Sequence, residues 1–451
     1  MKLDVQVSGR NVAKLYRERD EYVLKYLPGV DTDAFVSLTM PVREEAWRWP
    51  RDLHPFFRQN LPEGFLLGII REEFGPLLDG TDLSLLAVVG GMGVGRVTVT
   101  PEGVEPGTNL DPLQIEELLS AENTSEHFAR LVRQYARASI SGVVPKFLAP
   151  QESMSGLDES LPLGKPTLRT AHHIVKGSDD NTPFLGFNEF YSMKVLERLQ
   201  VVPVAGSRMS DDGRVLIVER FEVDAHGVPT HGLEDACGLL GLPPHEKYAT
   251  TTEKLLHATR AYLPSDQVRV QMEQFGWHLL TNYVVRNADC HAKNVALYYS
   301  SLKDVRYTPV YDIVTTQAYS RFASSPPALS VSGRKTWAPG KTLEQFFNAR
   351  LGIAPRQYAE MVERLCESAV VVGNEVIEAA KNEPRWRNVA KNMVHAWNDG
   401  MSSLRSPKRT TLFSGLDVPI ADAGFSDPEP PVLSKEKLGT SELLARPRRK
   451  R

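Results

Sequence analysis

The sequence predicts an α+β protein, with strands concentrated in the first half of the chain and helices in the second. Apolar residues alternate at Leu3, Val5 and Val7, which is typical of a half-buried strand. Beyond residue 234 they recur at steps of three and four, the period of an amphipathic helix. With 451 residues, the chain is long enough for two or three domains.

Changes in composition divide the chain into four expected parts. These are a small β-rich module over residues 1–106, a mixed β lobe over 107–233, an all-helical lobe over 234–420 and a basic, disordered tail over 421–451. The first boundary follows from the segment 101–112, which is rich in Gly, Pro and acidic residues and is typical of a linker. The tail is expected to be solvated, with at most weak contact to an anionic partner.

Charge and cysteine content exclude several classes of protein. The net charge of −3 gives no signature of polyanion binding. The three cysteines lie far apart without a CxxC pair, which argues against a disulfide framework or a structural zinc site. The N-terminus lacks the apolar core of a signal peptide, and the apolar runs are too short to span a bilayer. We therefore expect a cytoplasmic protein without membrane contact.

Periodicity and turn residues predict the individual elements. In the N-terminal module we expect strands over 3–7, 22–27 and 96–100 and a helical stretch near 61–74. The expected strands of the mixed β lobe are 146–149, 173–176 and 215–219, with a helix over about 187–199. In the helical lobe we expect a long helix through 268–283 that is capped by Ser265, and further helices near 343–350 and 358–378.

A polar segment, Asp289-Cys290-His291-Ala292-Lys293-Asn294, directly follows the long helix. Asp289 and Asn294 have the Asp-x4-Asn spacing of a kinase catalytic loop. In such a loop the aspartate accepts the proton of the attacking hydroxyl and the asparagine holds Mg²⁺. This spacing arises roughly once by chance in a chain of this length. Taken alone, it fits a polar turn after a helix equally well.

Asp312 follows a short strand candidate, where a kinase places its second metal ligand. The expected Asp-Phe-Gly is replaced by Asp312-Ile313-Val314, so the flexibility that glycine gives this segment is missing. The segment after Asp312 is therefore expected to work differently from that of ordinary kinases. An aspartate at the end of a strand is also common in turns.

Lys176 ends the apolar run His173-Ile174-Val175, which predicts an interior strand with the ammonium group directed into a cleft. There it would pair with nucleotide phosphates. The alternative is an exposed lysine at a strand end, because lysine is seldom buried. Glu189, early in the next helix, either holds Lys176 as in kinases or only favours the helix dipole.

Two further segments are candidates for nucleotide contacts. Glu219, Arg220 and Phe221 follow an apolar strand and resemble a hinge that meets the adenine ring, although the same pattern also ends an edge strand. The segment Ser139–Lys146 is the better candidate for a phosphate loop, because its small residues let backbone N–H groups approach phosphates. Gly91–Gly95 lies about eighty residues before Lys176 and is interpreted as a turn.

In this order, the motifs resemble the HipA kinase toxins of bacterial HipBA toxin–antitoxin modules, over about residues 1–420. The matching stretches are Ser139-Ile140-Ser141-Gly142, His173-Ile174-Val175-Lys176, Asn188-Glu189-Phe190-Tyr191, Val218-Glu219-Arg220-Phe221, Asp289-x-His291-Ala292-Lys293-Asn294 and Tyr311-Asp312-Ile313. Leu233-Glu234-Asp235, Gly241-Leu242-Pro243 and Lys247-Tyr248 also match. The resemblance implies a protein-kinase-like two-lobed fold with a HipA-type N-terminal module.

The resemblance also implies cofactors and residue roles. The cofactors are ATP and Mg²⁺, with Asp289 as the catalytic base and Asn294 and Asp312 as metal ligands. The implied ATP-binding residues are Ser141, Gly142, Val143, Val144, Pro145, Lys146, Lys176, Glu219, Arg220, Phe221, His291, Ala292, Lys293, Asn294, Tyr311 and Asp312. Autophosphorylation is implied at Ser139 or Ser141. A phosphate there adds about −1.5 to −2 charges beside ATP and should expel the loop.

Some positions depart from the family pattern. Cys290 stands where glycine is common, and Val143-Val144-Pro145 is stiffer than the expected loop. The implied function is nevertheless that of a serine/threonine kinase toxin that phosphorylates a translation component, by analogy an aminoacyl-tRNA synthetase. A helix-turn-helix antitoxin of the HipB type would neutralise it, and DNA would be contacted only through that antitoxin.

Two alternatives compete with this function. The first is a catalytically inert kinase fold that acts as a co-repressor with the antitoxin. The intact set Lys176, Asp289, Asn294 and Asp312 argues against it. The second is a kinase of lipids or small molecules, which the lack of a basic amphipathic membrane helix disfavours.

Overall fold

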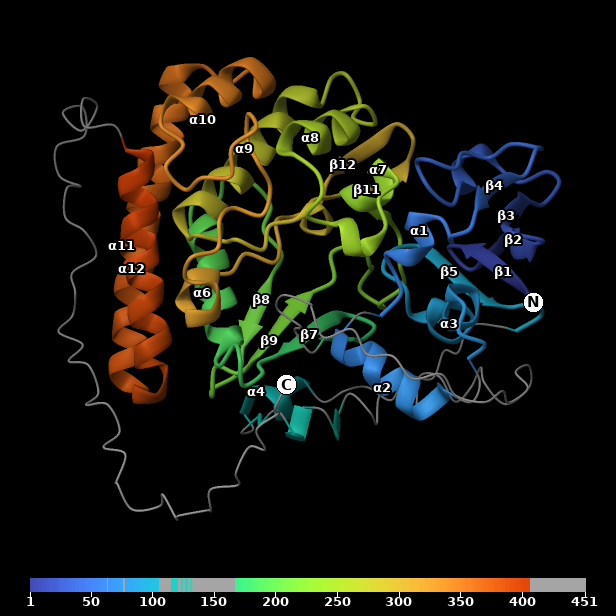
Figure 1. The fold of residues 1–451 in the computed structure, drawn as a ribbon, viewed down its shortest axis with the longest axis horizontal. Helices are drawn as coiled ribbons and strands as arrows, with labels where there is room; N and C mark the ends of the chain where they lie inside the picture. Colours follow the sequence, from blue (N-terminus) through green and yellow to red (C-terminus); the bar gives the residue numbers. More distant parts are fainter. Residues whose placement is uncertain are drawn as a thin grey trace, which may run out of the picture.

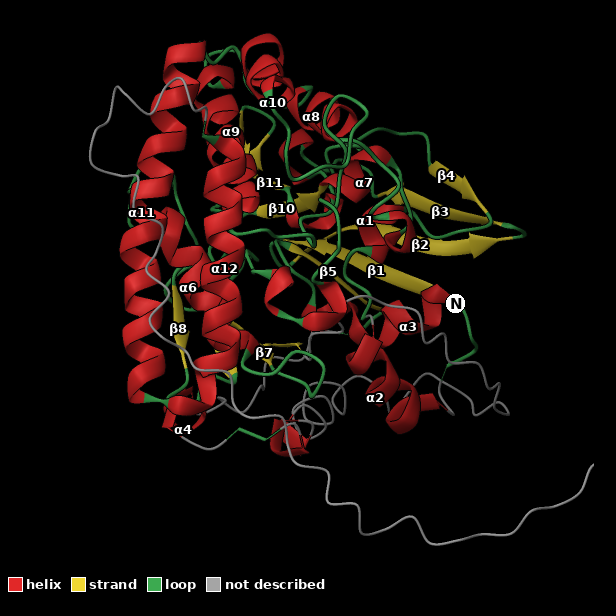
Figure 2. Cartoon of the chain, turned by 60° about the vertical axis from the view of Figure 1, so that its left-hand side comes forward, coloured by secondary structure: helices red, strands yellow, loops and turns green. Residues whose placement is uncertain are grey.

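The computed structural model describes residues 1–62, 64–75, 78–104, 115–120, 123–124, 126–128, 130–131 and 167–405. Within these residues three antiparallel sheets and a group of helices build the protein. The N-terminal sheet lies on one side of the molecule, and the two longest helices lie on the opposite side (Figures 1 and 2). No helix in the described part is both long and apolar enough to cross a membrane.

The N-terminal module is a five-stranded sheet in the order β4-β3-β2-β1-β5. Its strands are β1 (Lys2–Val7), β2 (Arg10–Glu18), β3 (Glu21–Tyr26), β4 (Trp47–Pro50) and β5 (Val97–Pro101). Its helices are α1 (Pro55–Arg58), α2 (Gly64–Phe74) and α3 (Asp82–Val89). The expected strands are present, whereas α3 was not predicted. Nearly every side chain of α3 is buried, so this helix has no polar face and no amphipathic period.

The mixed β lobe contains a four-stranded sheet in the order β6-β7-β9-β8. The strands are β6 (Thr167–Arg169), β7 (His173–Gly177), β8 (Ser207–Met209) and β9 (Val215–Glu219). Helix α6 (Leu185–Glu197) packs on this sheet, and the short helix α4 (Ile115–Ser120) lies at its lower edge in Figure 1. The predicted strands at 173–176 and 215–219 and the predicted helix near 187–199 are confirmed. The predicted strand 146–149 lies outside the described residues.

The helical lobe is organised around one central helix, α9 (Val268–Val284). The other helices are α7 (Ala236–Leu240), α8 (Thr252–Arg260), α10 (Lys341–Phe346), α11 (Pro355–Asn382) and α12 (Arg387–Leu404). Helix α9 begins after Gln267, so Ser265 does not cap it as predicted but lies in the preceding turn. Gly400 brings α12 against the end of α9: a Cβ atom there would lie 2.0 Å from the carbonyl oxygen of Val284.

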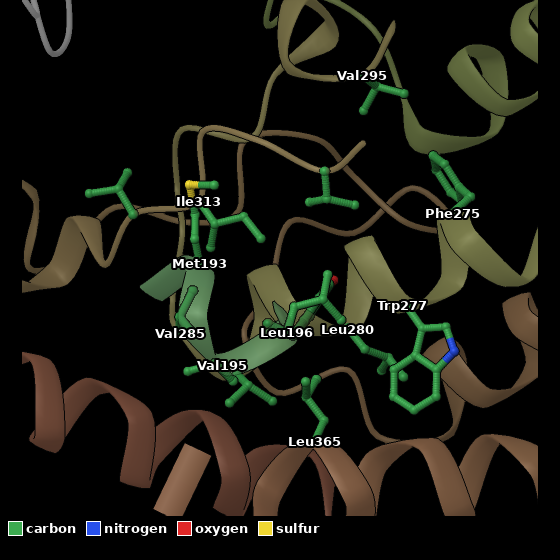
Figure 3. Close-up of a cluster of buried hydrophobic side chains, with 14 of the residues drawn as sticks. Met193, Val195, Leu196, Phe275, Trp277, Leu280, Val285, Val295, Ile313 and Leu365 are labelled. Atoms are coloured by element: carbon green, nitrogen blue, oxygen red, sulfur yellow. The ribbon is translucent and has the colours of Figure 1, made fainter. Parts of the chain in front are cut away.

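A continuous apolar core joins the two lobes. Met193 and Leu196 of α6 meet Trp277 and Leu280 of α9, and Leu365 of α11 closes the cluster from below (Figure 3). Burying large apolar side chains of this kind stabilises a fold by about 1.5–3 kcal/mol each. The core therefore fixes the end of α9 relative to the sheet that contains Lys176.

The helical lobe also contains a small sheet, although the sequence predicts an all-helical lobe with only one short strand candidate, before Asp312. Strands β10 (Gly232–Asp235), β11 (Ala296–Ser301) and β12 (Asp304–Tyr307) pair in that order. Their register sets Asp235 opposite Ala296 and Leu297 opposite Tyr307. The predicted catalytic segment 289–294 consequently lies between α9 and β11. Asp312 follows a few residues after β12.

The N-terminal module docks on this small sheet. Phe35 stacks on Tyr299 of β11 with 5.2 Å between the ring centroids. Arg96 donates hydrogen bonds to the carbonyl oxygens of Ser300 at 2.8 Å and Phe35 at 3.2 Å. Glu234 of β10 is fully buried and accepts a 2.7 Å hydrogen bond from Ser37 Oγ. The module is thus fixed to the strand that follows the predicted hinge.

Candidate active site

The turn after α9 places Asp289. Its backbone N–H donates to Asn287 Oδ1 at 2.9 Å, and Asn287 Nδ2 donates to Asn282 Oδ1 at 2.7 Å. Asn282 belongs to the last turn of α9, whose side chains are mostly buried. The turn is therefore held by hydrogen bonds to a packed helix. Asp289 itself is buried, with 7% of its surface exposed.

Two aromatic side chains surround the Asp289 carboxylate. The Tyr248 hydroxyl donates a hydrogen bond to Asp289 Oδ1. His291 Nε2 lies 3.9 Å from the same oxygen, and the rings of His291 and Tyr248 pack edge to face. The carboxylate is thus held in a defined orientation and is largely buried.

Asn294 and Asp312 are neighbours in space. Asn294 Nδ2 donates to Asp312 Oδ2 at 2.6 Å and to the backbone oxygen of Asp289 at 3.2 Å. The backbone oxygen of Asp312 accepts a hydrogen bond from Asn287 Nδ2 at 3.3 Å. Asp312 has a φ of +59°, in the left-handed region that few residues other than glycine adopt. One hydrogen-bonded network therefore connects the two predicted metal ligands with the predicted base.

Lys176 of β7 reaches the same network. Its Nζ atom forms an ion pair with Asp312 Oδ1 at 2.7 Å and a second with Glu189 Oε1 of α6. Glu189 is fully buried, while 12% of the Lys176 side chain is exposed. Of the two interpretations of Lys176, the structure has the one directed into the cleft. Glu189 contacts the lysine rather than only the helix dipole.

A cleft of about 190 Å³ separates the β lobe from the helical lobe, with Lys176 on its wall. The other lining residues are Gln59, Asn60, Val94, Arg169, Ile174, Val218, Glu219, Arg220, Phe221, Glu222, Leu233, Asp235, Lys293 and Tyr311. The predicted hinge residues therefore line the same cleft as Lys176. Lys293 and Tyr311, from the two predicted catalytic segments, line it as well. The lining combines apolar side chains with a few polar ones, as in most sites for small molecules.

Local contacts fix the hinge end of the cleft. The ring of Phe221 lies 6.0 Å from that of Tyr311, whose hydroxyl donates to the backbone oxygen of Lys293 at 3.1 Å. Burial raises the pKa of Tyr311 well above its usual value, so this hydroxyl remains a hydrogen-bond donor. The guanidinium group of Arg220 binds Glu222 at 2.8 Å and the backbone oxygen of Thr170 at 2.8 Å. These bonds tie the hinge to the turn between β6 and β7.

Some predicted residues have other positions. Ala292 is fully buried beneath the catalytic turn, and its N–H donates to the backbone oxygen of Lys247. Ser139, Ser141, Gly142, Val143, Val144, Pro145 and Lys146 lie outside the described residues. Burial raises the pKa of the Cys290 thiol to about 12 and lowers the pKa of the neighbouring His278 to about 4. The Cys290 side chain is half-buried, and its sulfur lies 3.8 Å from His278 Nε2.

The side chains of Asn294 and Asp312 fit Mg²⁺ by their chemistry. Mg²⁺ prefers oxygen ligands and is usually bound by one or two carboxylates together with phosphates and water. In the described part of the chain no three His, Cys, Asp or Glu side chains gather into a cluster that could hold a metal by themselves. A site that depends on nucleotide phosphates to complete the metal coordination agrees with this arrangement.

Sequence reasoning missed the roles of several site residues. Asn287 precedes Asp289 by two positions, and this Asn-x-Asp pattern is a usable signal, because asparagine side chains often bind the backbone two residues further on. Tyr248 was recognised only as part of a family stretch. Gln59, Asn60 and Val94 come from the N-terminal module, more than eighty positions before Lys176. No local pattern connects them with the cleft.

Family models match both parts of the chain. The HipA-like C-terminal domain matches residues 138–372, and the HipA N-terminal domain matches residues 3–100. The chain belongs to the HipA family. The HipA N-terminal domain corresponds to the module that docks on β10 and β11. The HipA-like C-terminal domain contains Lys176, Asp289, Asn294 and Asp312.

Individual relatives agree with this assignment. The chain is 29% identical over 327 residues to "Putative kinase Y4mE" of Sinorhizobium fredii, a match that covers 67% of this chain and 73% of the relative. It is 23% identical over 234 residues to a "Putative kinase" of Haemophilus influenzae, covering 48% of this chain and 63% of the relative.

A solved structure has the same fold. The complex of HipA, HipB and operator DNA from Shewanella oneidensis superposes with a TM-score of 0.60 at 19% identity. The match covers 89% of this chain and 96% of the matched chain. The prediction of an α+β, kinase-like HipA fold is thereby confirmed.

Proposed function

We propose that this HipA protein is an ATP- and Mg²⁺-dependent serine/threonine protein kinase. One observation carries the proposal. Lys176, Asp289, Asn294 and Asp312 come from three separate segments and meet in one network at a cleft whose other wall is the hinge. Phosphoryl transfer needs a cation for the phosphates, oxygen ligands for the metal and a carboxylate for the attacking hydroxyl.

Each side chain then has a role in the transfer. Lys176 binds the nucleotide phosphates while Glu189 holds the lysine in place. Asp289 accepts the proton of a serine or threonine hydroxyl of the substrate. The hydroxyl oxygen forms a bond to the γ-phosphorus, and the bond between the γ-phosphorus and the bridging oxygen breaks, so that ADP leaves. Asn294 and Asp312 would hold Mg²⁺, which neutralises charge on the phosphates. The products are a phosphoester, ADP and the proton taken up by Asp289.

The hinge end of the cleft is suited to the base of ATP. Glu219, Arg220 and Phe221 border the cleft, and Ile174 and Val218 add apolar side chains to its lining. A flat aromatic base buries well against apolar side chains of this kind. The predicted phosphate loop, Ser141–Lys146, would cover the opposite end.

The family membership supports the wider proposal. The chain would act as a toxin in the cytoplasm and would phosphorylate a translation component such as an aminoacyl-tRNA synthetase. A HipB-like helix-turn-helix antitoxin would bind it, just as HipA, HipB and operator DNA form one complex in Shewanella oneidensis, and would provide the contact with DNA. Autophosphorylation of Ser139 or Ser141 would inactivate the kinase by placing phosphate charge next to ATP.

Substitution of the predicted base tests the proposal. Asp289→Asn keeps the shape of the side chain and removes its capacity to accept a proton, so phosphate transfer from radiolabelled ATP should fall by about 10²–10⁴-fold. ATP binding should remain. Asp266→Asn, at an exposed position before α9, is the matched control and should keep full activity. Full activity of Asp289→Asn would disprove the kinase mechanism, and wild-type protein without any transfer would favour the inert co-repressor.

A further inference from the structure

The segment that follows Asp312 runs through the interior of the protein. Ile313, Val314 and Thr315 are fully buried, so water cannot reach the backbone groups of Thr315. Buried backbone N–H and C=O groups need hydrogen-bond partners, and Thr315 belongs to no strand that could supply them. The partners therefore come from side chains of other elements.

Asn188 of α6 binds the backbone of Thr315 at two points. The N–H of Thr315 donates to Asn188 Oδ1 at 2.8 Å, and Asn188 Nδ2 donates to the backbone oxygen of Thr315 at 2.9 Å. One fully buried amide thus engages both the donor and the acceptor of one residue, as a neighbouring strand would. This clamp, the pair of bonds between Asn188 and Thr315, fixes the segment after Asp312 to α6.

A chain of hydroxyl groups supports the clamp. Trp397 Nε1 of α12 donates to Thr315 Oγ1 at 2.7 Å, and Thr315 Oγ1 lies 3.1 Å from Ser192 Oγ. Ser192 Oγ donates to Asn188 Oδ1 at 3.2 Å, so the Thr315 hydroxyl is the donor toward Ser192. All four side chains are fully buried. Helices α6 and α12 are thereby joined through Thr315.

The next residue fixes the other side of the segment. Thr316 Oγ1 donates to the backbone oxygen of Arg286 and accepts the N–H of Ala288, each at 2.8 Å. Arg286 and Ala288 lie in the turn between α9 and Asp289. The segment is therefore held by α6 on one side and by the catalytic turn on the other.

Adjacent residues of α6 hold two different parts of the site. Asn188 clamps the segment that begins with Asp312, and Glu189 pairs with Lys176. The ion pair between Lys176 and Asp312 closes the ring of contacts. In the proposed function a nucleotide with its metal competes for this ion pair, whereas the clamp is buried and remains.

We propose that Asn188 is a positioning residue for phosphate transfer: its clamp on Thr315 keeps the Asp312 carboxylate at the metal position while Glu189 keeps Lys176 at the phosphates. The inference rests on the proposed ATP- and Mg²⁺-dependent function. Ile313 and Val314 stand where other kinases have Phe-Gly, and the clamp holds this stiffer segment in one arrangement. The metal ligand is thus placed by buried contacts of the chain itself.

Hydrogen–deuterium exchange of the full chain without nucleotide tests whether the clamp holds the segment. Asn188→Ala removes both bonds, so the peptide containing Asp312–Thr316 should exchange about 10-fold faster. Ser368→Ala is the matched control, because Ser368 Oγ donates a buried 2.7 Å hydrogen bond from α11 to the backbone oxygen of Val195 on the same helix α6. It should leave the exchange of this peptide within about 2-fold of the wild type.

Nucleotide binding tests the effect on the metal ligand. Calorimetry gives the dissociation constant of the non-hydrolysable analogue AMP-PNP with Mg²⁺ and with EDTA. Asn188→Ala should weaken binding about 10-fold with Mg²⁺ and less than about 2-fold with EDTA, because Lys176 and Glu189 are unchanged. Thr315→Val removes only the hydroxyl chain and should show the same pattern at about 3-fold. Thr315→Ser and Ser368→Ala should bind like the wild type under both conditions.

The outcomes separate this inference from the proposed function. If the wild type binds AMP-PNP and transfers phosphate, but Asn188→Ala keeps slow exchange or full Mg²⁺-dependent binding, the positioning role is wrong and the kinase stands. Equal weakening with Mg²⁺ and with EDTA also overturns the role, since Asn188 would then act on general stability. If Asn188→Ala does not fold, Thr315→Val decides by the same two measurements. If the wild type neither binds AMP-PNP nor transfers phosphate, the proposed function fails and the positioning role fails with it.

Discussion

Two junctions connect the parts of this HipA protein, and their chemistry differs. The junction between the β lobe and the helical lobe combines the apolar core of α6, α9 and α11 with charged groups at the edge of an open cleft, where Lys176, held by Glu189, pairs with Asp312. The junction between the N-terminal module and the helical lobe consists of stacked rings and hydrogen bonds to backbone oxygens around Arg96. The first is partly open to solvent and the second is buried.

This difference indicates which junction can change during function. In the proposed function, a nucleotide with its metal carries charges that can replace the ion pair between Lys176 and Asp312, so these groups would rearrange on binding ATP. No ligand can take the place of the stacked rings and backbone hydrogen bonds at the module junction. We therefore expect the module to stay fixed to the helical lobe, and the rearrangement to be confined to the charged groups at the cleft.

The largest expected effect comes from removing the charge at the first junction. Lys176→Met should lower phosphate transfer by more than about 100-fold, since the phosphates lose their cation. It should also lower the free energy of unfolding by about 3–5 kcal/mol, because Glu189 remains buried without its lysine. The double variant Lys176→Met/Glu189→Leu should recover most of this stability and none of the activity.

Urea unfolding and transfer assays measure these two quantities. Lys254→Met, at an exposed position of α8, serves as the control and should change neither by much. If the double variant is no more stable than Lys176→Met, the Glu189 carboxylate does not depend on Lys176 to offset the cost of its burial. The charged character assigned to this junction would then be wrong.

An intermediate effect is expected at the second junction. Arg96→Met removes hydrogen bonds to Ser300, Asp33 and Phe35 and the stacking of the guanidinium group on the Phe35 ring. The free energy of unfolding should fall by about 3 kcal/mol. The turnover rate at saturating ATP should stay close to that of the wild type. Arg17→Met, exposed on β2, should change stability by less than about 0.5 kcal/mol. A strong loss of turnover in folded Arg96→Met would mean that the module junction takes part in catalysis.

The smallest expected effect is a pH dependence of the same junction. Burial raises the pKa of Glu234 to about 7, against the opposing hydrogen bonds from Ser37 and Leu38. Since the folded pKa lies above the ordinary value of 4.5, the folded state holds this proton more tightly than the unfolded state. The stability from Glu234 is therefore complete below about pH 4.5 and is lost as the pH rises through 7.

Glu234→Gln keeps an oxygen acceptor and cannot ionise, so it should remove this loss. The melting temperature of the wild type should fall relative to that of the variant by several degrees between pH 5.5 and 8. Burial also lowers the pKa of His54 and of His278, which destabilises both proteins in acid and cancels in the comparison. Glu18→Gln, exposed on β2, is the control. If the melting temperatures of the wild type and Glu234→Gln change by the same amount between pH 5.5 and 8, Glu234 is not the group that causes the pH dependence.

The sequence predicted the parts of the site that depend on neighbouring residues. Asp289 and Asn294 lie on one short turn, and Lys176 ends an apolar strand, so local spacing and periodicity marked them as candidates. The order of the motifs and the resemblance to the HipA family then selected them. Strand β10 was missed because it is four residues long and pairs with residues about sixty positions later. The cleft residues Asn60 and Val94 were missed for the same physical reason, since docking between distant segments leaves no periodic pattern.

The left-handed backbone of Asp312 has a further consequence. This residue begins Asp-Ile-Val where many kinases have Asp-Phe-Gly, so no glycine is available next to it to change conformation. An aspartate in the left-handed region carries a conformational energy of about 1–2 kcal/mol. The hydrogen bonds of its carboxylate with Lys176 and Asn294 therefore help to hold a backbone conformation that this residue would seldom adopt by itself.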